Sequence, residues 1–167
     1  MIIILGAAFN IRTYLLYTQA YHSLNNGEYL QGSSNDYSAM EHDKNFLYLL
    51  GEQYLQHDLF EEAIKVKKRL AEIAPTSALL CDLGMLYLHK NEPDSALDCF
   101  LNAQAMTPNH VQPVYGLWLV TKMRDEKKEC VKLSIEIITK PVRIVNSIVL
   151  KARKEAKVYL KEQGINF

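Results

Sequence analysis

The sequence is poor in features that several classes of protein depend on. Its 167 residues carry a formal net charge of zero, which argues against nucleic acid as a partner drawn by overall attraction. Three cysteines, far apart and in no Cys-x-x-Cys spacing, argue against a disulfide framework and a zinc site. Five prolines, seven glycines and no low-complexity tract are not typical of a disordered chain. The composition indicates a folded chain with a sizeable core.

The short motifs of common enzyme chemistry are also missing. The sequence has no GxxxxGK(S/T), GxGxxG, GxSxG or HExxH. Glu61 with Glu62, and Asp125 with Glu126, are paired acids at expected helix starts, where the helix dipole favours them without a catalytic role. We therefore expect no catalytic residue, no cofactor and no metal, and a protein that is not an enzyme. The histidines are scattered, at His22, His42, His57, His89 and His110.

One apolar run occupies residues 1–9. A bilayer-spanning helix needs about 20 residues, so this run is too short to cross a membrane. It also lacks the basic region and the cleavage site of a signal peptide. Two interpretations stay open: the run packs on the next helix, or it is the stump of a membrane helix that attaches the domain to a bilayer.

A repeat of 33 residues predicts the fold. Within each unit, apolar residues spaced as i, i+3, i+4 and i+7 predict a first helix, and a second apolar stripe predicts another after a turn. A glycine inside a helix costs about 1 kcal/mol, so we expect the second helix to approach closely at Gly51 and Gly84, through Ala63 and Ala96. The matched pairs are Leu47/Leu80, Leu50/Leu83, Gly51/Gly84, Tyr54/Tyr87, Ala63/Ala96, Leu70/Ala103 and Pro75/Pro108.

This pattern resembles the tetratricopeptide repeat (TPR). Leu80, Leu83, Gly84 and Tyr87 match it closely, whereas Lys67 stands where the family prefers an aromatic residue. The resemblance implies an all-α, right-handed solenoid of helical hairpins, with an N-terminal helix and a C-terminal capping helix. Because one hairpin cannot bury its apolar face alone, the units must stack. The function it implies is protein–protein interaction or scaffolding.

We expect five segments along the chain. Residues 1–9 are the apolar lead-in, and residues 10–43 form an N-terminal helix and a loop. Residues 44–109 hold two TPR units, and residues 110–141 form a degenerate third helical pair. Residues 142–167 form a basic capping helix.

The expected capping helix begins at Ser147 as its N-cap and covers the last repeat with one stripe, Ile148, Ala152, Ala156 and Tyr159. Its other face is basic, and we interpret it as a candidate surface for anionic lipid or a lipid-linked sugar phosphate. The alternative is an ordinary solvated helix face. The basic residues are Lys151, Arg153, Lys154, Lys157 and Lys161.

The resemblance also implies a concave groove lined mainly by the first helix of each pair. Such a mixed apolar groove suits an extended or helical segment of a protein or peptide partner. Some family members use lysine and asparagine to hold a peptide's terminal carboxylate, and that arrangement is missing here. The alternative is that the N-terminal helix buries the groove. The implied lining residues are Asn45, Tyr48, Glu52, Leu55, Cys81, Met85, Leu88, His89, Tyr115, Leu119 and Lys122.

The order of segments is similar to the soluble tail of bacterial O-antigen ligase or polymerase-like membrane proteins. The similarity rests on the apolar lead-in, the helix start at residues 45–48, the repeats, residues 140–143 and the basic last helix. It implies an accessory domain in surface-polysaccharide assembly, on the cytoplasmic or the periplasmic side of a membrane. The alternative is a free cytoplasmic solenoid that acts as a spacer or self-associates without a ligand.

Overall fold

The computed structural model describes residues 42–165 continuously, together with Met40 and residues 15, 18–20, 22–23 and 26. The described positions between residues 15 and 26 have helical backbone. The expected lead-in at residues 1–9 and most of the expected loop before Met40 lie outside the described residues, so the predictions made for them stay predictions.

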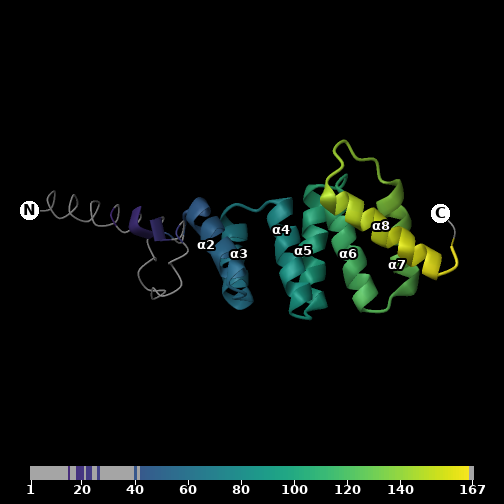
Figure 1. Ribbon diagram of the computed structural model, residues 1–167, viewed down its shortest axis with the longest axis horizontal. Coiled ribbons are helices and arrows are strands. Elements are labelled where there is room, and N and C mark those ends of the chain that lie inside the picture. The colour runs from purple at the N-terminus through teal and green to yellow at the C-terminus, as the bar shows by residue number, and fades with distance from the viewer. Residues whose placement is uncertain are drawn as a thin grey trace, which may run out of the picture. The chain divides into compact units, whose positions relative to one another are not determined.

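Every regular element between residues 42 and 165 is a helix (Figure 1), which confirms the all-α prediction. None of the helices that the structure describes is long and apolar enough to span a bilayer. The helices are α2 (Lys44–Gln56), α3 (Phe60–Ile73), α4 (Ser77–His89), α5 (Pro93–Met106), α6 (Val111–Met123), α7 (Lys127–Thr139) and α8 (Ser147–Glu162).

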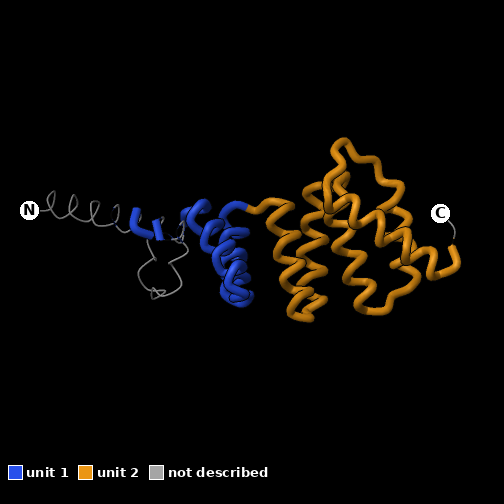
Figure 2. Tube along the Cα trace, in the orientation of Figure 1, with its two compact units in different colours: residues 1–74 blue, residues 75–167 orange. Residues whose placement is uncertain are grey.

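The chain forms two compact units, residues 1–74 and residues 75–167 (Figure 2). In the first unit, α2 packs against α3. In the second, consecutive helices from α4 to α8 pack on one another, and α6 also contacts both α4 and α8. Helix α8 therefore contacts α6 and α7 in the way that α6 contacts α4 and α5.

Short polar side chains define where helices begin. The Asp43 carboxylate accepts hydrogen bonds from the backbone N–H groups of Asn45 and Phe46, at 2.8 and 3.1 Å. Thr76 caps α4 in the same way. Asn146, not Ser147, is the N-cap of α8, because its side chain accepts from the Val149 N–H at 2.9 Å. The expected N-cap was therefore wrong by one residue.

The turn inside each helical pair uses a left-handed residue. Asp58, Asn91 and Asp125 have φ of 58°, 62° and 55° between the two helices of successive pairs. Aspartate and asparagine tolerate this region better than other residues with a Cβ, because the short polar side chain can bond locally. The three turns therefore share one backbone conformation that the sequence supports.

The third pair is displaced by one residue from the 33-residue pattern. Ser77 of α4 follows Lys44 of α2 by 33 positions, whereas Val111 of α6 follows Ser77 by 34. The extra residue lies in the segment 107–110 before α6, which is four residues long, against three in the segment 74–76 before α4. This displacement explains why the third pair looks degenerate when it is aligned at an offset of 33.

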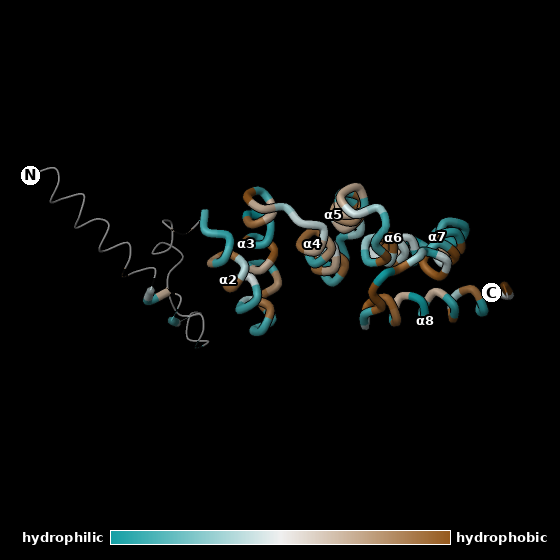
Figure 3. Tube along the Cα trace, turned by 90° about the horizontal axis from the view of Figure 1, so that it is seen from above, coloured by the Kyte–Doolittle hydropathy of each residue, from teal (hydrophilic) through white to brown (hydrophobic). Residues whose placement is uncertain are grey.

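The core of the second unit runs from α4 to α8 (Figure 3). Trp118, Val114 and Leu117 of α6 are buried in it, as are Cys130 and Ile137 of α7. On α8 the buried stripe starts at Val149, and the expected Ile148 is exposed. The remaining buried residues of α8 are Ala152, Ala156, Tyr159 and Leu160.

The glycines meet different neighbours from those expected. A Cβ placed on Gly84 would lie 2.6 Å from Cζ of Phe100, and one on Gly51 would lie 3.3 Å from Cγ of Lys67. Neither Ala63 nor Ala96 is among the three nearest neighbours. Phe100 also fills the space at Gly116 of α6, where a Cβ would lie 2.2 Å from its ring. One phenylalanine ring therefore packs against glycines of two helices.

Candidate functional site

In the first unit, the four expected groove residues lie on α2 and differ in accessibility. Asn45 is exposed, Tyr48 is 54% exposed and Leu55 is half-buried. Glu52 holds the ammonium of Lys67 at 2.7 Å, and this ammonium also lies 5.9 Å from the centre of the Tyr48 ring. Glu52 is therefore occupied within the unit, and Asn45 and Tyr48 are the side chains most open to a partner.

In the second unit, α4 presents Met85, which is 43% exposed, and the exposed His89. Leu88 is half-buried and packs against the core. Two other expected groove residues do not line an open surface: Cys81 is buried, and Tyr115 is only 5% exposed. The Tyr115 hydroxyl donates to Glu155 of α8 at 2.8 Å, so α8 covers this part of α6.

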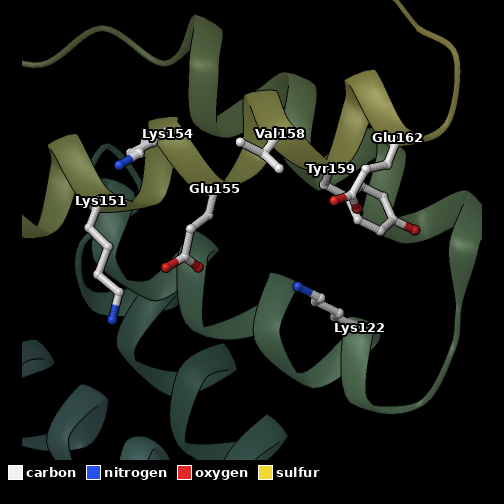
Figure 4. Close-up of a pocket in the computed structure, with 7 residues that line it drawn as sticks. All are labelled: Lys122, Lys151, Lys154, Glu155, Val158, Tyr159 and Glu162. Atoms are coloured by element: carbon white, nitrogen blue, oxygen red, sulfur yellow. The ribbon is translucent and has the colours of Figure 1, made fainter.

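A hollow of about 410 Å³ lies between the end of α6 and α8 (Figure 4). We call it the α6–α8 hollow. Figure 4 shows Lys151 and Glu155 pointing from α8 toward α6, and Lys122 pointing back toward α8. The hollow therefore gathers charged side chains from two helices of one unit. Its lining residues are Lys122, Lys151, Lys154, Glu155, Val158, Tyr159 and Glu162.

Aromatic rings form the wall beneath this hollow. Trp118 stacks on Tyr115 with 5.9 Å between ring centres, and it meets Tyr159 edge-on at 5.8 Å. The Trp118 indole N–H donates to the Ser134 hydroxyl at 2.8 Å. The Lys122 ammonium lies 5.0 Å from the centre of the Trp118 ring, within reach of a cation–π interaction. Because both ring polar groups are satisfied, the aromatic wall is a fixed surface.

The phenols of this wall stay protonated at neutral pH. Burial raises the pKa of Tyr115, and the hydrogen bond to Glu155 with the charge of that carboxylate raises it further. Burial is also the main cause that raises the pKa of Tyr159. Tyr115 can therefore act as a hydrogen-bond donor to Glu155, which fixes the carboxylate on the side of the hollow.

The hollow carries three ammonium groups and two carboxylates. One of the carboxylates, Glu155, already accepts the Tyr115 hydrogen bond. The three lysines have no ion pair among the described residues. An anionic group placed beside Val158 would therefore meet lysine side chains from both helices, with an apolar surface behind it. Nowhere in the described part of the chain do three histidine, cysteine or acidic side chains gather as a metal site.

The five expected basic residues of α8 divide into two groups. Arg153 is half-buried and donates to the Lys140 carbonyl oxygen at 2.7 Å and the Ile137 carbonyl oxygen at 3.4 Å. A guanidinium at the last carbonyls of α7 is stabilising because those carbonyls carry partial negative charge. Arg153 is therefore a structural cap and not part of a free basic surface. The exposed members are Lys151, Lys154, Lys157 and Lys161.

The sequence analysis did not identify the hollow as a site. It assigned Lys122 to the groove and Lys151 and Lys154 to a separate basic face. The one sequence signal was the recurrence of Lys151, Glu155 and Val158 at helical spacing, which places them on neighbouring parts of one face. Which helix this face meets depends on how α8 packs on α6, and periodicity does not specify that.

Comparison with known proteins identifies the fold. No protein-family model matches the chain, and no curated protein matches its sequence. A solved structure of MamA is 20% identical over 90% of this chain and 88% of that one, with a TM-score of 0.64. The Sgt2 TPR domain from Aspergillus fumigatus is 15% identical over 73% of this chain and 82% of that one, with a TM-score of 0.60.

A third solved structure is YrrB, described as a TPR protein with an unusual peptide-binding site. It is 12% identical over 91% of this chain and 74% of that one, with a TM-score of 0.58. At these identities the similarity identifies the fold, and function has to be argued from the site. The 33-residue repeat, the helical pairs and the structural matches agree that this chain has the tetratricopeptide-repeat fold.

Proposed function

We propose that this chain is a protein-interaction module, a scaffold without catalysis, whose second unit binds an acidic segment of another protein. The observation that carries the proposal is the α6–α8 hollow, where three lysines surround an apolar wall. An acidic side chain of a partner would find opposite charge there, and its apolar neighbours would find Val158 and Tyr159. YrrB supports a peptide as the kind of ligand, since its structure is described by a peptide-binding site.

The bound segment would continue from the hollow onto α4. Leu88 of α4 and Lys122 of α6 are 34 residues apart, the offset that relates the two helices, so they occupy equivalent positions. Met85 precedes Leu88 by three residues and lies on the same side of α4. An extended segment could therefore place an apolar side chain near Met85 and an acidic one near Lys122.

The single tryptophan of the sequence provides the test. Trp118 lies beneath the hollow and beside Lys122, so its emission should change when an acidic peptide binds. The probe is a short peptide of alternating glutamate and leucine with an amidated end, and lysine replaces glutamate in the control peptide. We expect only the acidic peptide to bind, and Lys122→Glu with Lys151→Glu to weaken it about a hundredfold, because two attractive contacts become repulsive.

Lys128→Glu with Lys65→Glu is the matched control, because it changes the net charge equally at exposed lysines outside the hollow. Equal weakening by both pairs would show that only net charge matters and would contradict the proposal. Absence of binding by the acidic peptide would favour the alternative function, a spacer or a self-associating solenoid, which sedimentation over a range of concentrations would distinguish.

We propose a finer role from the order of segments: an accessory tail of a membrane protein of surface-polysaccharide assembly. It is supported by the resemblance in layout, from the apolar residues 1–9 to the basic last helix, and by that alone. The test is the extent of the native reading frame. Continuation upstream into a series of hydrophobic helices would support this role, and a frame that starts at Met1 would contradict it.

A further inference from the structure

Large apolar side chains are exposed where the chain enters α8. Ile144 is 80% exposed, more than any other large apolar side chain that the structure describes, and Leu150 is 60% exposed. Val145 is also exposed. None of the three lines a hollow, and the segment before α8 loops out beyond the helix ends (Figure 1). These side chains project from the surface and do not form a recess that a partner's side chain could fill.

Uncompensated cations accompany them. Leu150, Lys154, Lys157 and Lys161 follow a spacing of i, i+4, i+7 and i+11, which places them on one face of α8. No acid of α8 shares this stripe, and Arg143 adds a charge beside Ile144. Within the described residues, none of these four basic side chains has an ion pair. We call the set of Arg143, Ile144, Val145, Leu150, Lys157 and Lys161 the α8 entry face.

We propose that the α8 entry face docks on a bilayer that contains anionic lipids. Projecting apolar side chains suit a bilayer, since lipid chains adapt to any shape, whereas a protein partner would need matching recesses. Lysine and arginine beside them would meet the lipid phosphates and carboxylates. The apolar tips would enter the boundary between headgroups and acyl chains while α8 lies along the surface.

This inference goes beyond the proposed function and uses other residues. The hollow relies on Lys122 and Lys151, and the bilayer contact relies on the apolar tips with Lys157 and Lys161. The structure also changes the basic surface expected from the sequence, because Arg153 caps α7 and Arg143 joins the exposed cations. The two surfaces can therefore be tested with separate variants.

Co-sedimentation of the chain with vesicles tests the proposal. We expect binding to vesicles of phosphatidylcholine mixed with phosphatidylglycerol at low salt, and none to phosphatidylcholine alone. Ile144→Ser with Val145→Ser leaves the charge unchanged and should weaken binding about tenfold or more by removing the inserting side chains. Lys157→Gln with Lys161→Gln should weaken it by a similar factor and make it less dependent on salt.

Two controls match these variants. Leu101→Ser removes an exposed apolar side chain on α5, and Lys65→Gln with Lys68→Gln removes two exposed lysines on α3. Both should bind vesicles as the wild type does, and so should Lys122→Glu. Absent binding, binding to phosphatidylcholine alone, or full binding by the Ile144→Ser, Val145→Ser variant would overturn the proposal. Equal loss in the controls would overturn it as well.

Discussion

The first two helical pairs share one sequence pattern but are held together by different contacts. In α4–α5 the ring of Phe100 packs directly on Gly84, so closely that a Cβ would lie 2.6 Å from it. In α2–α3 the equivalent residue is Lys67, which is 1% exposed and binds Glu52 through its ammonium at 2.7 Å. A steric contact in one pair is thus replaced by an ion pair over a flexible aliphatic chain in the other.

The third pair reverses the arrangement. At its offset of 34 residues, Trp118 stands where Gly84 does and Ser134 where Phe100 does, and the two are joined by a hydrogen bond of 2.8 Å. The large side chain has moved from the second helix of the pair to the first. The fold therefore conserves the combined volume at this contact more strictly than the identity of either residue, as expected for a closely packed interior.

The largest effect should come from Gly84→Ala. The new methyl would overlap the Phe100 ring, which Gly116 confines on its other side, so the ring cannot easily move. We expect the free energy of unfolding to fall by about 2 kcal/mol, since overpacking outweighs the gain in helix propensity. Urea unfolding followed by circular dichroism measures this. An unchanged midpoint would show that the contact with Phe100 is looser than the structure indicates.

Loss of the ion pair in the first unit should have the next largest effect. Glu52→Gln leaves the buried ammonium of Lys67 without its counter-charge, and we expect a loss of about 1–2 kcal/mol, moderated because Glu52 is partly exposed. Lys67→Met removes the charge itself and should be nearly neutral. Urea unfolding of both variants separates the cost of an unpaired charge from that of lost packing. Equal losses in the two would mean that packing dominates.

The comparison can be sharpened by converting one pair into the other. Gly51→Ala should change stability by less than about 1 kcal/mol in the wild type, because the methyl meets the Lys67 aliphatic chain at 3.3 Å and gains helix propensity. In a Lys67→Phe background the same change should cost about 1 kcal/mol more, since a ring would now face it as Phe100 faces Gly84. A double-mutant cycle measures this coupling, and zero coupling would contradict it.

The smallest predicted effect concerns pH and the equivalent positions Tyr48 and Cys81. Tyr48 is exposed, whereas burial raises the pKa of the Cys81 thiol from its ordinary 9.0 to about 12. Between these values the unfolded chain releases the thiol proton and the folded chain keeps it, so stability falls as pH rises. From pH 8 to pH 10 we expect a loss of about 1 kcal/mol from this thiol. Urea unfolding under reducing conditions should show a smaller decrease in Cys81→Ala.

The sequence predicted the helices well because periodicity and turn residues are local signals. The matched residues around Gly51 and Gly84 were sufficient for the helical pairs and the fold. It did not predict which side chain meets each glycine, because Lys67 and Phe100 come from the facing helix and their approach depends on the interhelical distance. The N-cap at Asn146 could have been found, because asparagine is a stronger cap than a hydrophobic neighbour.

The candidate site was less predictable. Tyr115 and Arg153 both looked accessible from their positions on helix faces, and both make contacts with another helix. Each contact is set by the packing of α8 on α6 and α7, which brings together residues about 13–40 positions apart. A pattern within one helix cannot specify which neighbour that helix meets, so the hollow became visible only in three dimensions.

The way α8 ends the second unit matters to anyone who would build a longer protein from this one. Ala152 and Ala156 turn toward the preceding helices, while the stripe through Lys154, Lys157 and Lys161 faces away from them. A repeat fused behind α8 would meet these lysines and find little to pack on. One inserted between α5 and α6 would have apolar neighbours on both sides. Engineers should therefore lengthen this scaffold from the inside.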